Sequence, residues 1–205
     1  MQALRLSWLN IGLAPLAAVF VALVCLAAGP ARADKAAEQY VQDRADEVMA
    51  IINNSSYSTA KKKAEISDII DEFIDVERIA MFTLGKYRSQ VGDSERDDYV
   101  AAFREYLINY YVGQLSQFEG VTLKVTGSQD DARKGTLVSS IAATDNGEPT
   151  EIDWQVASGT SIVDVSIAGV SMAQTLREQV VSTIDQNDGQ ISPAIDLLHQ
   201  LANEG

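Results

Sequence analysis

The sequence is poor in the residues that build metal sites and nucleophilic catalytic centres. It contains one cysteine, Cys25, and one histidine, His199, among 205 residues. A zinc site or a Ser-His or Cys-His nucleophile pair is therefore not expected, and we expect His199 on a helix surface. Basic residues are also scarce, 16 against 29 acidic ones, which gives a net charge of −13. This balance argues against a nucleic-acid partner and against permanent attachment to an anionic membrane.

The first 33 residues have the pattern of a cleaved secretory signal. A short positively charged start is followed by a mostly apolar run, residues 9–28, and then by Ala-Arg-Ala at 31–33. That order predicts cleavage before Asp34. The alternative is an uncleaved membrane anchor, because about 20 apolar residues suffice to span a bilayer.

The remainder, residues 34–205, has the length of a single domain with a substantial core. Cys25 lies in the predicted signal, so the exported part would have neither a disulfide nor thiol chemistry. The signal removes two arginines and no acid, which leaves 14 basic and 29 acidic residues and a net charge of −15. We expect a freely diffusing monomer.

Hydrophobic periodicity divides this part into helices, then strands, then helices. Apolar residues recur at helical spacing in residues 34–56, 58–75, 76–84, 94–118, 171–186 and 192–202. Alternation with a period of two marks strands at 121–126, 135–144, 149–157 and 162–167, with turn residues between them. We predict an α+β fold in which helices pack on one face of a curved, four-stranded antiparallel sheet and enclose an apolar cavity in a cone-like arrangement.

The stretch from Thr160 to Val180 joins the last strand to the next helix. Gly169 breaks the strand pattern, and Ser171 is a suitable helix N-cap. We expect the strand to run directly into the helix and the helix to fold back over the sheet. A bend at Gly169 would then decide whether space remains between the two.

The helix at 94–118 has an unusually wide aromatic face. Tyr99, Phe103, Tyr106 and Tyr110 follow one another at steps of four, three and four residues. Such a stripe is typical of a solid core, but tyrosine hydroxyls need partners or water. A cavity wall is the alternative interpretation.

Two stretches carry a family resemblance. IAMFTLGKYRSQVGDSERDDYVAAFREYLINYYVGQL, residues 79–115, and IVDVSIAGVSMAQTLREQV, residues 162–180, resemble the periplasmic phospholipid-binding component of the Mla (maintenance of lipid asymmetry) pathway. This MlaC family includes toluene-tolerance and hopanoid-associated auxiliary proteins. The sequence departs from the family pattern in having no tryptophan near Gly85 and in having Val180 where phenylalanine is common.

The resemblance implies a phospholipid carrier in the periplasm, without enzymatic activity or cofactor. It implies lipid exchange with an outer-membrane lipoprotein complex and with the MCE-domain subunit of an inner-membrane ABC transporter. Two alternatives remain open: a small exported enzyme with the same cone-like fold, and an adaptor whose aromatic face packs solidly.

For a carrier, we expect two apolar walls and a cationic mouth. The helical wall would consist of Phe82, Leu84, Phe103, Leu107, Tyr110 and Tyr111, and the sheet and hinge would add Trp154, Val163, Val165, Ile167, Val170 and Met172. Tyr87 would lie near the mouth, with Lys86 and Arg88 as cations for the head-group phosphate. We expect the cavity to exceed the usual ligand-pocket range of about 300–1,000 Å³ and to be lined without paired acids.

Overall fold

The computed structural model describes residues 34–113, 115–131, 134–144, 147–157 and 161–204. Its elements are α2 (Lys35–Ile52), α3 (Thr59–Phe73), α4 (Val76–Thr83), η1 (Gly85–Ser89), α5 (Asp93–Gly113), η2 (Leu115–Phe118), β1 (Thr122–Asp131), β2 (Gly135–Ala143), β3 (Thr150–Ala157), β4 (Ser161–Ile167), β5 (Val170–Ser171), α6 (Met172–Gln186) and α7 (Ser192–Ala202). The predicted signal segment lies outside the described residues, as do parts of the three predicted turns between strands. Within the described ranges, no helix combines the length and apolar character needed to cross a membrane.

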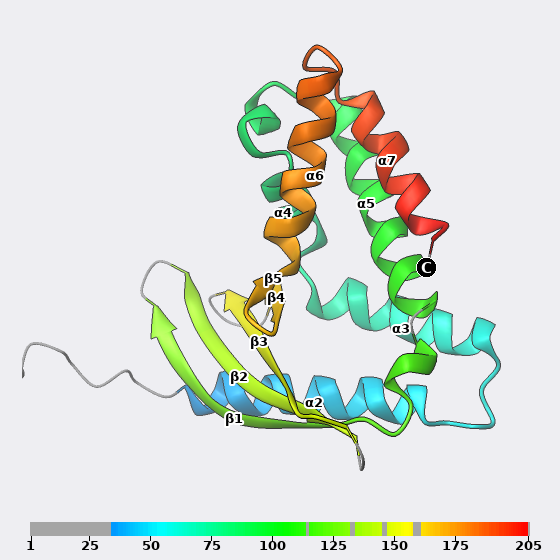
Figure 1. Ribbon diagram of the computed structural model, residues 1–205, viewed down its shortest axis with the longest axis vertical. Helices are drawn as coiled ribbons and strands as arrows, with labels where there is room; N and C mark the ends of the chain where they lie inside the picture. Colours follow the sequence, from blue (N-terminus) through cyan, green and yellow to red (C-terminus); the bar gives the residue numbers. More distant parts are fainter. Residues whose placement is uncertain (1–33, 114, 132–133, 145–146, 158–160, 205) are drawn as a thin grey trace, which may run out of the picture. The chain divides into compact units, whose positions relative to one another are not determined.

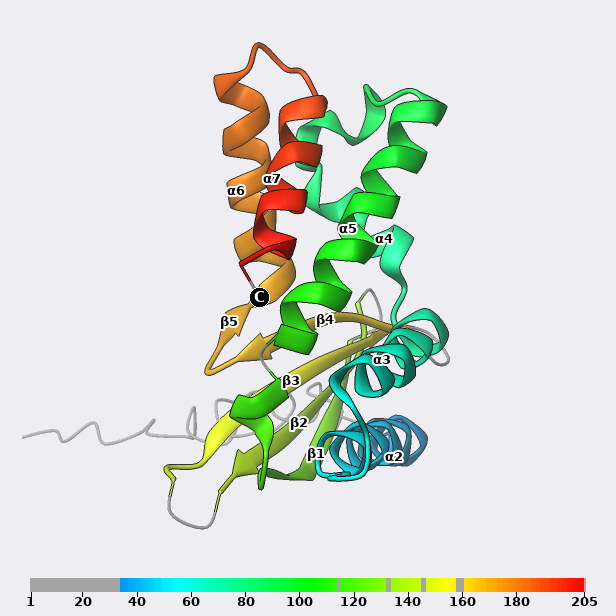
Figure 2. The same ribbon diagram turned by 90° about the vertical axis from the view of Figure 1, so that its right-hand side faces the viewer.

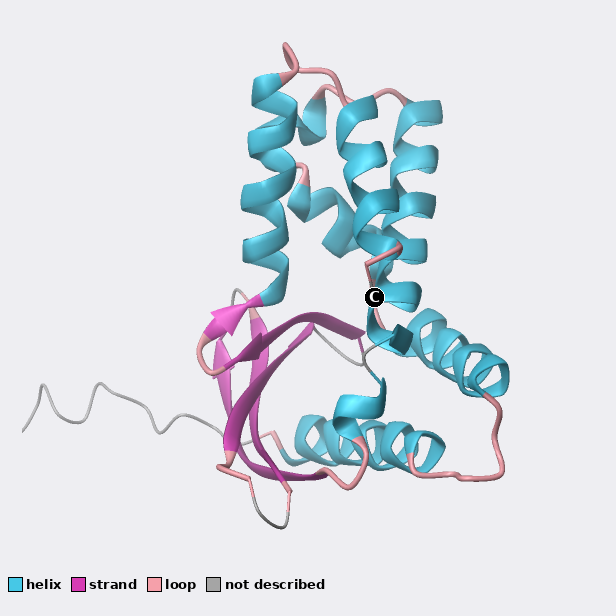
Figure 3. Cartoon of the chain, turned by 45° about the vertical axis from the view of Figure 1, so that its right-hand side comes forward, coloured by secondary structure: helices cyan, strands magenta, loops and turns pink. Residues whose placement is uncertain are grey.

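The strands form one antiparallel sheet in the order β1-β2-β3-β4-β5 (Figure 1). Figure 3 shows these strands curving around the side on which α2 lies. The predicted α+β fold with a curved antiparallel sheet is confirmed. The sheet has one strand more than predicted, because the two-residue β5 pairs with the end of β4.

The chain reverses between β4 and β5 instead of running straight into a helix, which corrects the prediction for this stretch. Ala168 has φ 50° and Gly169 has φ 79°, and Ile167 pairs with Val170 across them. Two consecutive positive φ values are those of a type I′ hairpin turn. Helix α6 begins only after this hairpin, where the Ser171 hydroxyl accepts a hydrogen bond from the Gln174 amide at 3.0 Å.

Helix α2 begins at Lys35 because the Asp34 carboxylate accepts hydrogen bonds from two amides of its first turn. The helix is fastened to the edge strand β1 by a side-chain amide. Gln42 donates to the Leu123 carbonyl at 3.1 Å and accepts from the Val125 amide at 2.9 Å. This pairing satisfies backbone groups of an edge strand that would otherwise be free to pair elsewhere.

Helix α3 ends where the chain meets the sheet. Ile74 leaves the helical conformation and forms an isolated parallel bridge with Ile162 of β4, and the Asp75 amide donates to the Ile162 carbonyl at 3.1 Å. The Asp75 carboxylate then caps α4. Two residues, Ile74 and Asp75, therefore connect α3 to α4, and both bind to β4.

Helices α4, α5, α6 and α7 pack together (Figures 1 and 2). At their centre, the Tyr99 hydroxyl lies 2.7 Å from the Thr83 hydroxyl, which itself donates to the Ala80 carbonyl. Both Tyr99 and Thr83 are fully buried. The helix predicted for residues 94–118 ends at Gly113 as an α-helix, and Phe118 belongs to the short helix η2.

The hairpin at Ala168-Gly169 yields a stability prediction. A β-carbon at Gly169 would meet nothing within 4 Å, so Gly169→Ala should act only through its positive φ. We expect the free energy of unfolding to fall by about 1–2 kcal/mol, measured by chemical denaturation.

Gly127→Ala is the matched control, because Gly127 also has open space around it but no positive φ. It should change stability by less than about 0.5 kcal/mol. Equal effects of the two substitutions would contradict a type I′ turn as the source of the difference.

Candidate functional site

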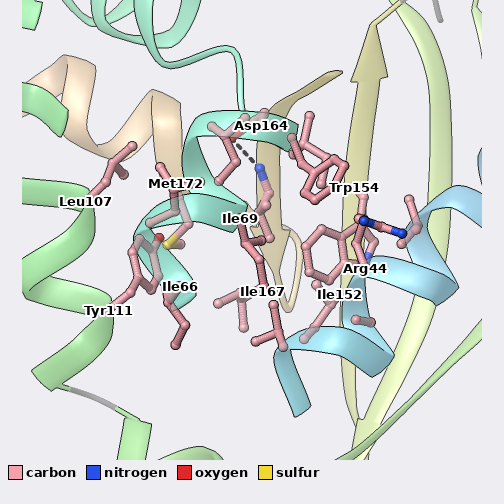
Figure 4. A pocket seen from close by; sticks show the side chains of 18 of the residues that line it. Arg44, Ile66, Ile69, Leu107, Tyr111, Ile152, Trp154, Asp164, Ile167 and Met172 are labelled. Carbon is pink, nitrogen blue, oxygen red and sulfur yellow. Dashed lines mark hydrogen bonds between the residues drawn. The ribbon is translucent and has the colours of Figure 1, made fainter. Parts of the chain in front are cut away.

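An apolar cavity of about 290 Å³ lies between the sheet and the helices (Figure 4). Helices α2, α3, α4 and α5, the short helix η2 and the start of α6 line it on one side, and strands β1 to β4 on the other. The lining residues are Val41, Arg44, Ala45, Val48, Met49, Ile52, Ile66, Ile69, Ile70, Phe73, Ile74, Ile79, Phe103, Tyr106, Leu107, Tyr111, Phe118, Val121, Leu123, Ala142, Ile152, Trp154, Ile162, Asp164, Val165, Ile167, Met172, Ala173 and Leu176.

The Trp154 side chain presents its carbon face to the cavity while its polar atom is satisfied within the sheet. Its indole nitrogen donates to the Ser140 hydroxyl at 2.9 Å, and that hydroxyl donates to the Ile152 carbonyl at 2.9 Å. Ser140 is fully buried. This chain of bonds fixes the ring and keeps the wall apolar.

Asp164 is the one carboxylate among the described lining residues. It accepts hydrogen bonds from the Val165 amide at 2.9 Å, from the Ala173 amide at 3.1 Å and from the Ser171 hydroxyl. These bonds join β4 to the first turn of α6. The carboxylate therefore holds the hairpin and the helix start together, and its oxygens are occupied by protein donors.

Two tyrosines of α5 face the cavity. Burial raises the pKa of Tyr106 to about 12 and raises the pKa of Tyr111 still further, and neighbouring acidic groups add to the second shift. The Tyr111 ring lies beside Met172 in Figure 4. The neutral hydroxyls of Tyr106 and Tyr111 are weakly polar groups in a mostly apolar wall.

Arg44 of α2 is the one cation among the described lining residues. Its guanidinium lies over the Phe73 ring, 4.1 Å from the ring centroid, and its Nη1 is 2.9 Å from a Glu47 carboxylate oxygen. Its Nε is buried and has no hydrogen-bond partner among the described residues. Arg44 was not among the predicted site residues, because a single arginine on an amphipathic helix carries no signal of its own.

The structure brings part of the predicted wall to this cavity. The residues that line it as predicted are Phe103, Leu107, Tyr111, Trp154, Val165, Ile167 and Met172. Their role in binding a ligand stays a prediction.

Two predicted wall residues, Phe82 and Leu84, lie elsewhere, and so does Tyr87, which was predicted near the mouth. Leu84 is fully buried in the core formed by the helices, and Phe82 is 40% exposed with the Arg177 guanidinium 4.7 Å from its ring centroid. The Tyr87 hydroxyl donates to Asp185 of α6. These residues lie away from the cavity because this end of α4 packs against α6, whereas Ile79 of the same helix lines the cavity.

Three further predicted wall residues are also displaced from the cavity. A bulge in β4 pairs Val156 with Ile162 and Gln155 with Asp164, so Val163 is the extra residue and Ile162 lines the cavity instead. Val170 is 53% exposed because it lies in β5, beyond the hairpin turn. Tyr110 packs its ring against Tyr106 and Tyr111, with centroid distances of 5.5 Å to each.

The predicted cationic mouth is not beside the cavity either. Lys86 lies 2.7 Å from an Asp185 oxygen, and its pKa is raised by the hydrogen bond to that carboxylate. Arg88 is exposed at the end of η1. Neither residue lines the cavity.

Helices α2 and α3 supply much of the helical wall, which was predicted to come from Phe82, Leu84 and the helix now called α5. Their contribution includes Val41, Val48 and Ile52 of α2, and Ile66, Ile69, Ile70 and Phe73 of α3. Both apolar stripes are visible in the sequence. Nothing in the spacing shows that they face a cavity and not a filled core.

The cavity is smaller than predicted. Its volume of about 290 Å³ lies at the lower edge of the usual range of ligand pockets, about 300–1,000 Å³, and not above it. Two methionines, Met49 and Met172, line it. Unbranched, flexible thioether side chains adapt readily to a ligand, so the walls have means to widen.

The fold and the site define an α+β protein with an apolar cavity between a curved sheet and its helices. The family described as MlaC protein matches residues 42–200. The chain belongs to the MlaC family, as the two sequence stretches indicated.

A solved structure shares this fold. It is a phospholipid-binding protein from Ralstonia solanacearum in complex with a phospholipid. The two chains superimpose with a TM-score of 0.69 at 20% sequence identity, over 82% of this chain and 97% of the other.

The buried tyrosines predict a dependence of stability on alkaline pH. Tyrosines of the unfolded chain ionise near pH 10, whereas burial holds Tyr106 protonated until about pH 12 and Tyr111 beyond that. The unfolded state then binds fewer protons than the folded state, so the free energy of unfolding should fall as pH rises above about 10.

Denaturant unfolding at pH values from 8 to 11 measures this effect. Tyr111→Phe should reduce the decline, because one of the groups that resists ionisation is removed. A free energy of unfolding that stays constant up to about pH 11 would show that these hydroxyls reach water in the folded protein.

Proposed function

We propose that this protein binds phospholipid with the acyl chains in the cavity between sheet and helices, and that it carries the lipid through water between two membranes. The apolar cavity is the observation that carries the proposal. Support comes from membership of the MlaC family and from the phospholipid held by the Ralstonia protein of the same fold.

The energetics of lipid transfer explain why such a cavity is needed. Each methylene moved from a membrane into water costs about 0.8 kcal/mol. A diacyl lipid therefore does not cross water unshielded on a useful timescale. An apolar wall replaces the membrane interior at little net cost, so both uptake and release remain reversible.

The same argument requires partners at both ends of the transfer. Because water cannot accept the chains, release depends on docking to a protein or membrane that offers another apolar environment. We propose that the partners are an MCE-domain subunit of an inner-membrane ABC transporter and an outer-membrane lipoprotein complex. The location would be the periplasm, reached through cleavage of the signal predicted for residues 1–33.

The character of the cavity favours binding over catalysis. Its one carboxylate among the described residues, Asp164, is engaged by three protein donors. No group of three or more metal-ligating side chains occurs in the described part of the chain. The unfilled space itself favours a carrier over an adaptor with a solid core.

Lipid extraction tests the proposal. Protein produced from the full-length chain in a bacterial host should release phospholipid into organic solvent, at about one lipid per protein or more, as measured by mass spectrometry. Protein that carries no lipid and takes none up from vesicles would overturn the proposal.

Substitutions inside and outside the cavity locate the ligand. Leu107→Gln places a polar side chain in the wall, which should reduce bound lipid by about tenfold or more while the chain remains folded. Phe82→Gln is the matched control, because Phe82 lies outside the cavity and is 40% exposed. Equal losses in the two variants would exclude this cavity as the binding place.

A further inference from the structure

We propose that Arg44 anchors the oxyanion of the bound lipid, with the Nε edge of its guanidinium as the binding face. This inference rests on the proposed function and adds the group that orients the ligand. It assigns the head-group end of the cavity to α2 and not to the cations of η1.

The position of Arg44 suits a boundary between apolar wall and water. Its side chain is 29% exposed, while its Nε is fully covered. A lipid with its chains in the cavity must place its charged group at such a boundary, since a charge deeper in the apolar space would be desolvated without compensation.

The guanidinium is held in one orientation before any ligand arrives. The Phe73 ring lies beneath it, with the guanidinium carbon 4.1 Å from the ring centroid, and Tyr40 packs edge-on against the same ring at a centroid distance of 5.9 Å. A stacked guanidinium keeps its N–H groups in the plane of the stack. The donors are therefore pre-positioned.

The Nη1 side of the guanidinium has a protein partner, whereas its Nε does not. Glu47 contacts Nη1 at 2.9 Å, and Nε is buried with no hydrogen-bond partner among the described residues. Nε–H and the adjacent Nη2–H point in nearly the same direction and match two oxygens of one oxyanion. The protein covers Nε in this structure, so an oxyanion reaches it only when the side chains over it move aside. A charged donor left unpaired is costly, and a ligand that supplies these oxygens is favoured by that amount.

The distribution of polar groups gives the ligand a direction. Figure 4 shows Arg44 and Trp154 at one side of the cavity and Tyr111 and Leu107 at the other. Arg44 is the one cation among the described lining residues. The head group would lie at the Arg44 side and the acyl chains would extend toward Tyr111 and Leu107.

A phosphodiester and a fatty-acid carboxylate both present two suitable oxygens. We assign the site to the phosphodiester of a glycerophospholipid, in keeping with the proposed function. A fatty acid is the competing source, and the experiment distinguishes the two.

Binding of three lipids to protein produced from the full-length chain and stripped of lipid tests the assignment. Dioleoyl phosphatidylglycerol, dioleoylglycerol and oleate are delivered from cyclodextrin, and dissociation constants are measured for the wild type, Arg44→Met, Arg44→Lys and Arg104→Met. Arg104→Met is the matched control, since Arg104 is paired with Asp71 and lies outside this cavity. Melting temperatures of all four proteins are measured alongside.

We expect Arg44→Met to weaken phosphatidylglycerol binding by about 10–100-fold, the worth of a charge-assisted bidentate bond. Dioleoylglycerol, which has the same chains without the anion, should bind all four proteins equally within about twofold. Arg44→Lys keeps the positive charge but cannot donate two parallel hydrogen bonds from one planar group. Its affinity for phosphatidylglycerol should therefore lie between those of the wild type and Arg44→Met.

Phosphatidylglycerol affinity that is the same in Arg44→Met and wild type would overturn the inference, while the proposed function would stand if both lipids still bind. A loss confined to oleate would overturn the phosphodiester assignment in favour of a carboxylate. Failure of the wild type to bind any of the three lipids would overturn the proposed function itself.

Discussion

The energetic cost of an unfilled apolar space is the constraint on which the rest of the structure depends. At about 24 cal/mol per Å³, a cavity of about 290 Å³ would cost on the order of 7 kcal/mol if it were sealed and dry. That figure is comparable with the whole net stability of a typical domain, about 5–15 kcal/mol. The walls must therefore be held apart by specific contacts between the helices and the sheet, and a ligand that fills the cavity recovers much of this free energy.

Those contacts lie where the helices meet the sheet. Gln42 fastens α2 to the edge strand, and Ile74 bridges to Ile162 as the chain passes from α3 to α4. The Asp164 carboxylate ties β4 to the first turn of α6. Each is a hydrogen-bonded joint at a rim, which explains how the apolar residues between them remain apart without collapse.

The hairpin after β4 fixes the start of α6 against the sheet, which a simple bend at Gly169 would not do. Because Ala168 and Gly169 turn the chain back on itself, α6 starts from a strand that is already part of the sheet. Asp164 and Ser171 are thereby brought within hydrogen-bonding distance of one another. The volume of the cavity beside Met172 therefore depends on the contact between Asp164 and Ser171 as well as on the size of the lining side chains.

Most of the fold follows from periodicity in the sequence. Six helices and three strands were predicted close to their observed positions, because each has a clear apolar stripe or alternation. The strand predicted at 121–126 continues to Asp131, five residues further. The fifth strand was missed because two residues show no period. The α-helix at Asp93–Gly113 was predicted to be longer, since Phe118 continues the aromatic spacing into η2.

The site was predicted less well, for reasons of tertiary packing. Leu84 and Phe103 are equally apolar in the sequence, but only Phe103 faces the cavity, because α6 packs against the end of α4 next to Leu84. Val163 was wrongly predicted to line the cavity, because no residue type in the sequence indicates the bulge in β4. Arg44 becomes notable only when its buried Nε and its stacking on Phe73 are seen together.

The central claim is that acyl chains occupy the space between α2, α3 and the sheet. Photo-crosslinking with a phospholipid that carries a diazirine near the end of one acyl chain, followed by peptide mapping, tests this claim most directly. The account predicts label on cavity residues such as Ile69, Leu107 and Met172. Label concentrated instead on the exposed Phe82 or Val170 would contradict it.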